Sequence, residues 1–92
     1  MTLHERFDEF HAENPEVYRR LVEMARSLKK TGRERYGIAS LFEALRWHIA
    51  METKGDVFKC NNNFRAFYAR LIMERESDLA GFFETREQKV AA

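Results

Sequence analysis

Three consecutive asparagines and the basic residues beside them form the stretch best suited to recognition chemistry. The amide of an asparagine can make two hydrogen bonds to adenine, a guanidinium can do the same to guanine, and lysine or arginine neutralises phosphates. The stretch also opens a segment with helical spacing of apolar residues. It therefore predicts a surface that binds duplex DNA, formed by Lys59, Asn61, Asn62, Asn63, Arg65 and Arg70.

The same asparagines have a purely structural interpretation. Asparagine is among the best helix N-caps, and its side chain readily bonds to nearby backbone groups. In this alternative, Asn61–Asn63 cap the following helix and fix the preceding loop. Both interpretations stay open at this level.

Charge is unevenly distributed along the chain. Residues 1–16 carry one arginine and five acidic residues, a net charge of −4, whereas residues 17–73 have a net charge of +7 and residues 74–92 one of −2. A basic middle favours an anionic partner, and Arg33 and Arg35 in a charged connection are further candidates for phosphate contacts. The alternative is that these charges pair with carboxylates within the fold.

Other kinds of site have little support in the sequence. His4, His11 and His48 are scattered, and His48 with Glu52 supplies only two of the ligands that a metal site needs. Cys60 precedes a helix start without a histidine beside it, and no glycine-rich phosphate loop occurs. We therefore expect a non-enzymatic protein without metal, cofactor or small-molecule substrate.

Local signals in the first third of the chain predict two helices. Thr2 and Glu5 have the spacing of a capping box, which starts a short acidic helix that ends near residue 13. Asn14 is the predicted N-cap of a second helix, with Pro15 at its first position. This helix should run to about Lys30, and Gly32 should supply the left-handed residue that follows it.

Two further helices are expected in the rest of the chain. The third, from residue 38 to about 53, carries apolar residues on two sides, with Trp47, Ala50 and Met51 on the second side, and should pack between neighbours. In the fourth, from residue 62 to about 75, Ala66 and Ala69 should lie on the side that faces outward. A turn over residues 77–79 and a segment over 81–83 should close the core.

The predicted architecture is an all-α domain spanning residues 1–92, a compact bundle of four main helices with a short C-terminal helical turn. Residues 1–13 form its acidic N-terminal helix and residues 84–92 a frayed tail. Helices three and four resemble a helix-turn-helix, although the connection over residues 53–60 exceeds the usual three to four residues. No stretch approaches a membrane span or a signal peptide, so we expect a cytoplasmic protein without membrane contact.

Four segments resemble a group of small uncharacterised proteins encoded by bacteriophages and prophages. They are Glu43–Trp47, Phe58–Asn63, Tyr68–Arg70 and Gly81–Arg86. The resemblance implies a phage gene and a bacterial host cytoplasm, and it supplies no activity.

Two functions follow as expectations. The first is a phage-type DNA-binding protein that presents the helix beginning near Asn61. The second is a protein–protein interaction module that binds a host or phage protein, or a second copy of itself, through apolar surfaces such as Trp47 with Met51.

Overall fold

The computed structural model describes residues 1–52 and 63–84, and the account below concerns these residues. Within them the chain forms four α-helices, one short 3-10 helix and a pair of two-residue strands. The all-α architecture predicted from the sequence is therefore confirmed. In chain order the elements are α1 (Leu3–Glu13), α2 (Pro15–Lys30), β1 (Tyr36–Gly37), α3 (Ile38–Glu52), α4 (Phe64–Arg75), η1 (Ser77–Leu79) and β2 (Phe83–Glu84).

Local capping fixes the ends of the first two helices. The Thr2 hydroxyl accepts a hydrogen bond from the Glu5 backbone, and the Glu5 carboxylate accepts one from the Thr2 backbone, which completes the predicted capping box. Pro15 occupies the start of α2, and Gly32 follows that helix with φ +100°. The prediction for Asn14 was wrong in one respect. Its side chain makes no N-cap bond to α2 and instead donates to the Phe10 carbonyl at the end of α1.

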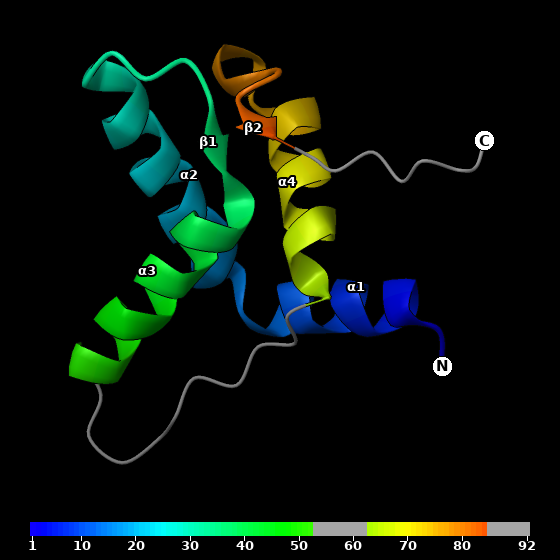
Figure 1. Ribbon diagram of the computed structural model, residues 1–92. Coiled ribbons are helices and arrows are strands. Elements are labelled where there is room, and N and C mark those ends of the chain that lie inside the picture. Colours follow the sequence, from blue (N-terminus) through cyan, green and yellow to red (C-terminus); the bar gives the residue numbers. More distant parts are fainter. Residues whose placement is uncertain (53–62, 85–92) are drawn as a thin grey trace.

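The helices pack around one apolar core. In Figure 1, α1 lies across the lower ends of α2 and α4, while α3 runs down and away from the middle of the molecule on the side of α2. Every helix contributes buried side chains to this core, and Tyr68, Phe42, Leu21, Leu41, Leu45 and Ile72 are the largest of those that are fully buried. Burial of this apolar surface is the main source of stability for a helical domain of this size.

The C-terminal part of the described chain folds back onto the core, as predicted. Gly81 has φ +75°, which lets the chain reverse after η1 and places Phe82 and Phe83 among the buried residues. β2 then pairs in parallel with β1, with Tyr36 opposite Phe83. The Tyr36 amide also donates to the Phe82 carbonyl at 3.0 Å.

Two predicted faces were wrong. Ala69, expected on the outer side of α4, is fully buried. Its small side chain therefore lets other core residues, rather than a partner, pack closely against α4. Trp47, Ala50 and Met51, expected to pack against a neighbouring element, are exposed. Helix α3 is therefore apolar on two sides, although only one of them contacts the core of the described molecule.

Several predictions fall on residues outside the described ranges. They concern Lys59, Cys60, Asn61 and Asn62, the last residue of the third helix at 53, and most of the C-terminal tail. The described α4 begins at Phe64 rather than at residue 62. Since residues 53–62 would form the turn of a helix-turn-helix, that motif stays a prediction.

Candidate functional site

The start of α4 was the centre of the predicted recognition surface, and its packing is set by α1. Phe7 is buried and contacts the rings of Phe64, Phe67 and Tyr68 at centroid distances of 4.8–5.6 Å. His4 stacks on Phe67 at 5.4 Å. The acidic helix α1 therefore lies against the N-terminal half of α4, as Figure 1 shows.

The described residues of the predicted recognition set lie around this contact. Asn63 is exposed directly before α4, and its side chain does not cap the helix. Arg65 is half-buried, whereas Arg70 is exposed and places its guanidinium 5.2 Å from the centre of the Phe67 ring. For Asn63 the helix-capping part of the structural alternative is therefore not supported, whereas its part in fixing the preceding loop stays a prediction. For Asn61 and Asn62 both interpretations stay predictions.

Arg33 and Arg35 lie elsewhere. Both are exposed in the connection between α2 and β1, and Arg33 lies 5.6 Å from the centre of the Tyr36 ring. Figure 1 places this connection at the upper end of α2, whereas α4 begins at the lower end of the molecule beside α1. The structure does not bring the two groups of predicted phosphate contacts together.

Three arginines in the middle of the sequence, Arg20, Arg26 and Arg46, are paired with carboxylates. Arg26 binds Glu76 at 2.7 Å and Asp78 at 2.9 Å, which joins α2 to the segment after α4. Lys29 donates to the backbone carbonyl of Asp78. The Tyr18 hydroxyl donates to Glu76 at 2.7 Å. For Arg26, the alternative of charge pairing with carboxylates within the fold is confirmed.

Two carboxylates of α3 are paired in the same way. Glu52 forms a double hydrogen bond with Arg20 of α2 at 2.7 and 2.9 Å, and this contact lowers the pKa of Glu52. Glu43 binds Arg46 at 3.1 Å, one turn along the helix. Glu52 is thus held by Arg20, which weakens the case for a metal shared with His48. Among the described residues, no group of three or more histidine, cysteine or acidic side chains is arranged to hold a metal ion.

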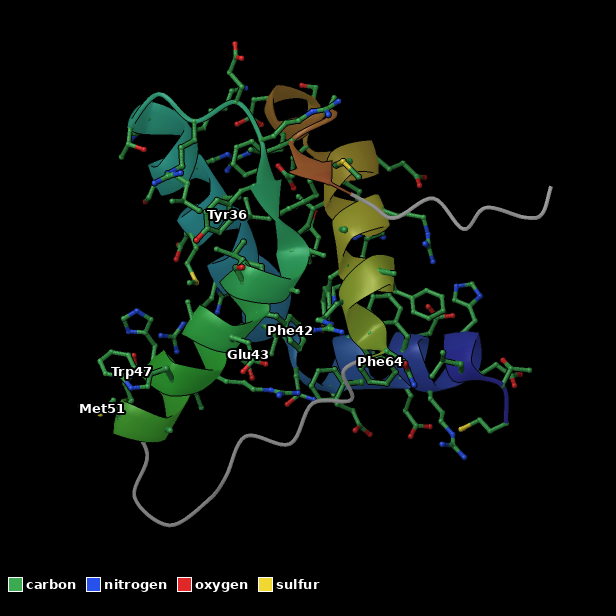
Figure 2. The ribbon with its side chains drawn as sticks, in the orientation of Figure 1. Tyr36, Phe42, Glu43, Trp47, Met51 and Phe64 are labelled. Carbon is green, nitrogen blue, oxygen red and sulfur yellow. The ribbon has the colours of Figure 1, made fainter. Side chains whose placement is uncertain are left out.

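Two of the exposed large apolar side chains of the described residues lie on the side of α3 that points away from the core. With 3.6 residues per turn, Ser40, Ala44, Trp47 and Met51 share this side, which we call the outward face. The side chains of Trp47 and Met51 are 61% and 69% exposed, and Figure 2 shows both at the far end of α3. The sequence identified the two large residues of this face.

Ser40 and Ala44 were missed as parts of this face. The signal that reveals them is their spacing: the four positions are separated by four, three and four residues, which is the pattern of a coiled-coil seam. Such a seam is narrow and straight along the helix. It is a suitable contact for another helix.

Comparison with known proteins gave no matching family model, no matching curated protein and no matching solved structure. The resemblance to phage-encoded proteins therefore stays a prediction from the sequence. Within the described residues, no helix combines the length and apolar character needed to cross a membrane.

Proposed function

We propose that the chain is a small non-enzymatic protein–protein interaction module whose contact surface is the outward face of α3. One observation supports this most strongly. The single tryptophan of the chain lies on the side of α3 opposite the core and is mostly exposed, with Met51 one turn further along. Tryptophan and methionine are enriched at protein interfaces, and tryptophan is one of the residues that most often dominates their binding energy.

These two side chains are not part of the buried core of the described residues. The opposite side of α3 already supplies Leu41, Phe42 and Leu45 to the core. Covering an exposed indole and thioether with a partner would remove apolar surface from water, at about 25 cal/mol for each Å² buried. A large apolar residue outside the core that gains stability on contact is well placed for binding. The proposed partner is a host or phage protein in a bacterial cytoplasm, consistent with the resemblance described above.

Site-specific photo-crosslinking tests this proposal. Benzoylphenylalanine at position 47 should give a discrete covalent adduct with another protein chain when the full chain is expressed in its source cells. The matched control carries the same group at Glu13, an exposed residue of α1. Equal labelling from both positions, or none from position 47 in a folded chain, would contradict the proposal.

Duplex DNA is the second candidate, and the exposure of Arg33, Arg35 and Arg70 supports it. In this proposal those side chains neutralise phosphates, and the residues from Lys59 to Arg65 present amides and a guanidinium to base edges. Affinity for duplex DNA should then fall steeply as salt rises, and the double variant Arg33→Gln/Arg35→Gln should show a shallower salt dependence.

The control for the DNA experiment separates recognition from folding. Asn62→Ala/Arg65→Ala should weaken binding while leaving the unfolding free energy unchanged. A loss of stability instead would assign these residues a structural role. Absence of binding at low salt would remove this second candidate.

A further inference from the structure

His11, in the last turn of α1, is part of the aromatic cluster that holds this helix. Its ring lies 5.8 Å from that of Phe7 on the same helix, 5.4 Å from Tyr18 of α2 and 6.0 Å from Tyr68 of α4, measured between ring centres. Phe7, the buried residue of α1, also contacts Tyr68. Two neighbouring side chains thus attach α1 to both α2 and α4.

The Nδ1 atom of His11 is buried and has no hydrogen-bond partner among the described residues. In a neutral imidazole this nitrogen can be the one without a proton, so that only an unused acceptor is buried. Protonation puts an N–H on both ring nitrogens, and the buried one then becomes a donor without an acceptor, which costs free energy. Water satisfies this donor once α1 has moved away. The geometry of the cluster therefore accepts the neutral ring and disfavours the charged one.

The charged groups around His11 do not reverse this preference. Burial of the ring lowers its pKa, and the charge of Arg75 from α4 lowers it further. On α1 itself, Asp8 and the carbonyl end of the helix favour the charged ring, but the pKa of His11 still lies below its ordinary value. From α2, the Tyr18 hydroxyl donates to Glu76, whose carboxylate is also bound by an arginine of α2 and is thus already engaged.

We propose that α1 is a pH-sensitive clasp over the start of α4, which protonation of His11 releases while α2 and α3 stay folded. This inference is independent of the contact surface on α3. Because Phe7 is the one side chain that α1 adds to the buried core of the described residues, few contacts have to be broken. An isolated helix of 11 residues is marginal in water, so α1 unfolds as it leaves the cluster.

Release of α1 changes the surface of α4. Phe7 contacts the rings of Phe64 and Phe67, and His4 stacks on Phe67 from the same helix. Figure 1 shows α1 lying across this end of α4. The departure of α1 therefore uncovers both phenylalanine rings, and a mildly acidic solution converts a covered aromatic surface into an exposed one.

Amide hydrogen exchange of the full chain, followed by mass spectrometry at about pH 7.5 and about pH 5.5, tests the clasp. After correction for the intrinsic pH dependence of exchange, the opening constant of residues 3–13 should rise several-fold on acidification. The limit for one proton is about tenfold, since the released histidine has its ordinary pKa of 6.5. The opening constant of residues 15–30 should change by less than about twofold. An equal rise in both segments, or no rise in either, would overturn the clasp.

The two histidines of α1 provide a matched pair of variants. His11→Phe keeps a planar ring in the cluster without a titratable nitrogen, so it should abolish the rise. His4→Gln should retain it, because the His4 side chain is 69% exposed and its Nε2 atom lies 3.7 Å from the Asp8 carboxylate, which accommodates the charge. Circular dichroism verifies the helix content of each variant, and His11→Leu replaces His11→Phe if the larger ring disturbs the fold. A rise that persists without His11, or that disappears in His4→Gln, would overturn the assignment.

A dye that binds exposed apolar surface reports the uncovered rings directly. The fluorescence of anilinonaphthalene sulfonate should increase between about pH 7.5 and about pH 5.5 in the parent chain and in His4→Gln. It should not increase in His11→Phe, in which α1 stays in place. An increase of equal size in all three chains would show that another group uncovers this surface, which contradicts the proposal.

Discussion

At the scale of single residues, His11 is the side chain most sensitive to its surroundings. Its ring contacts Phe7, Tyr18 and Tyr68, and among the described residues its buried Nδ1 atom has no hydrogen-bond partner. Burial lowers the pKa of His11 below its ordinary value of 6.5, and the charge of Arg75 lowers it further, while Asp8 opposes the shift. The folded chain therefore favours the neutral imidazole.

This shift makes stability depend on pH. Because the unfolded chain binds a proton at His11 more readily than the folded chain does, stability should be highest above pH 6.5 and fall as the pH decreases through that value. Urea unfolding at about pH 7.5 and about pH 5.5 measures the difference. The variant His11→Leu should reduce the pH dependence, and the exposed His48→Gln should retain it. Equal pH dependence in both variants would contradict this assignment.

Tyr18 supplies a second residue-scale prediction. Burial and its hydrogen bond to Glu76 raise the pKa of Tyr18 to about 12. The variant Tyr18→Phe removes the hydroxyl that links α2 to the segment after α4, and we expect it to lower the unfolding free energy by about 1 kcal/mol. The control Tyr36→Phe should stay within about 0.5 kcal/mol of the parent chain, because Tyr36 contacts Arg33 through its ring face. Thermal or urea unfolding distinguishes the two.

At the scale of elements, α1 depends on one buried ring. Phe7 is the buried residue of α1, so Phe7→Ala should cost about 3–5 kcal/mol, whereas Leu3→Ala in the exposed first turn should cost less than about 1 kcal/mol. Leu3 lies on the same side of α1 as Phe7 but is exposed at the first turn, so the pair compares a covered with an uncovered apolar residue. Equilibrium unfolding of the two variants gives this comparison. Similar losses for both would mean that α1 is held by something other than the aromatic cluster.

On the outward face of α3, unlike at Phe7, we expect substitution of a large apolar residue to change stability little. Trp47→Gln and Met51→Gln should change the unfolding free energy by less than about 0.5 kcal/mol, because these side chains contribute little to the core. Leu45→Ala on the buried side should cost about 2–5 kcal/mol. Urea titration at a concentration that keeps the chain monomeric is the measurement. A cost above about 2 kcal/mol for Trp47→Gln would show that the face is part of the fold.

The elements also show what could be predicted from the sequence. Helix ends depend on neighbouring residues, so the Thr2–Glu5 capping box, Pro15 and Gly32 were identified before the structure. The side of a helix that becomes buried depends on elements remote in sequence. For this reason Ala69 was wrongly placed outside, and for Trp47 the sequence left open whether it packs against a neighbouring element or faces a partner.

At the scale of the whole molecule, the sequence predicted that residues 81–83 return to the core but did not identify their partners or those of the long-range ion pairs. The pairing of β1 with β2 joins segments on either side of α3 and α4, and the contacts of Arg26 with Glu76 and Asp78 join α2 to the far end of α4. Overall charge patterning predicted a basic surface, whereas ion pairs neutralise part of it. The candidate site was therefore predicted in part. Hydrophobicity identified Trp47 and Met51 in the sequence, whereas their exposure is known only from the fold.

The account centres on one statement, that the single tryptophan of the chain faces solvent on a surface left open for a partner. Trp47 fluorescence tests it directly, since no other tryptophan contributes to the signal. In dilute solution the emission should be that of a water-exposed indole and should be quenched by iodide almost as efficiently as free tryptophan. A blue-shifted emission that iodide does not quench, in the dilute monomer, would contradict the account.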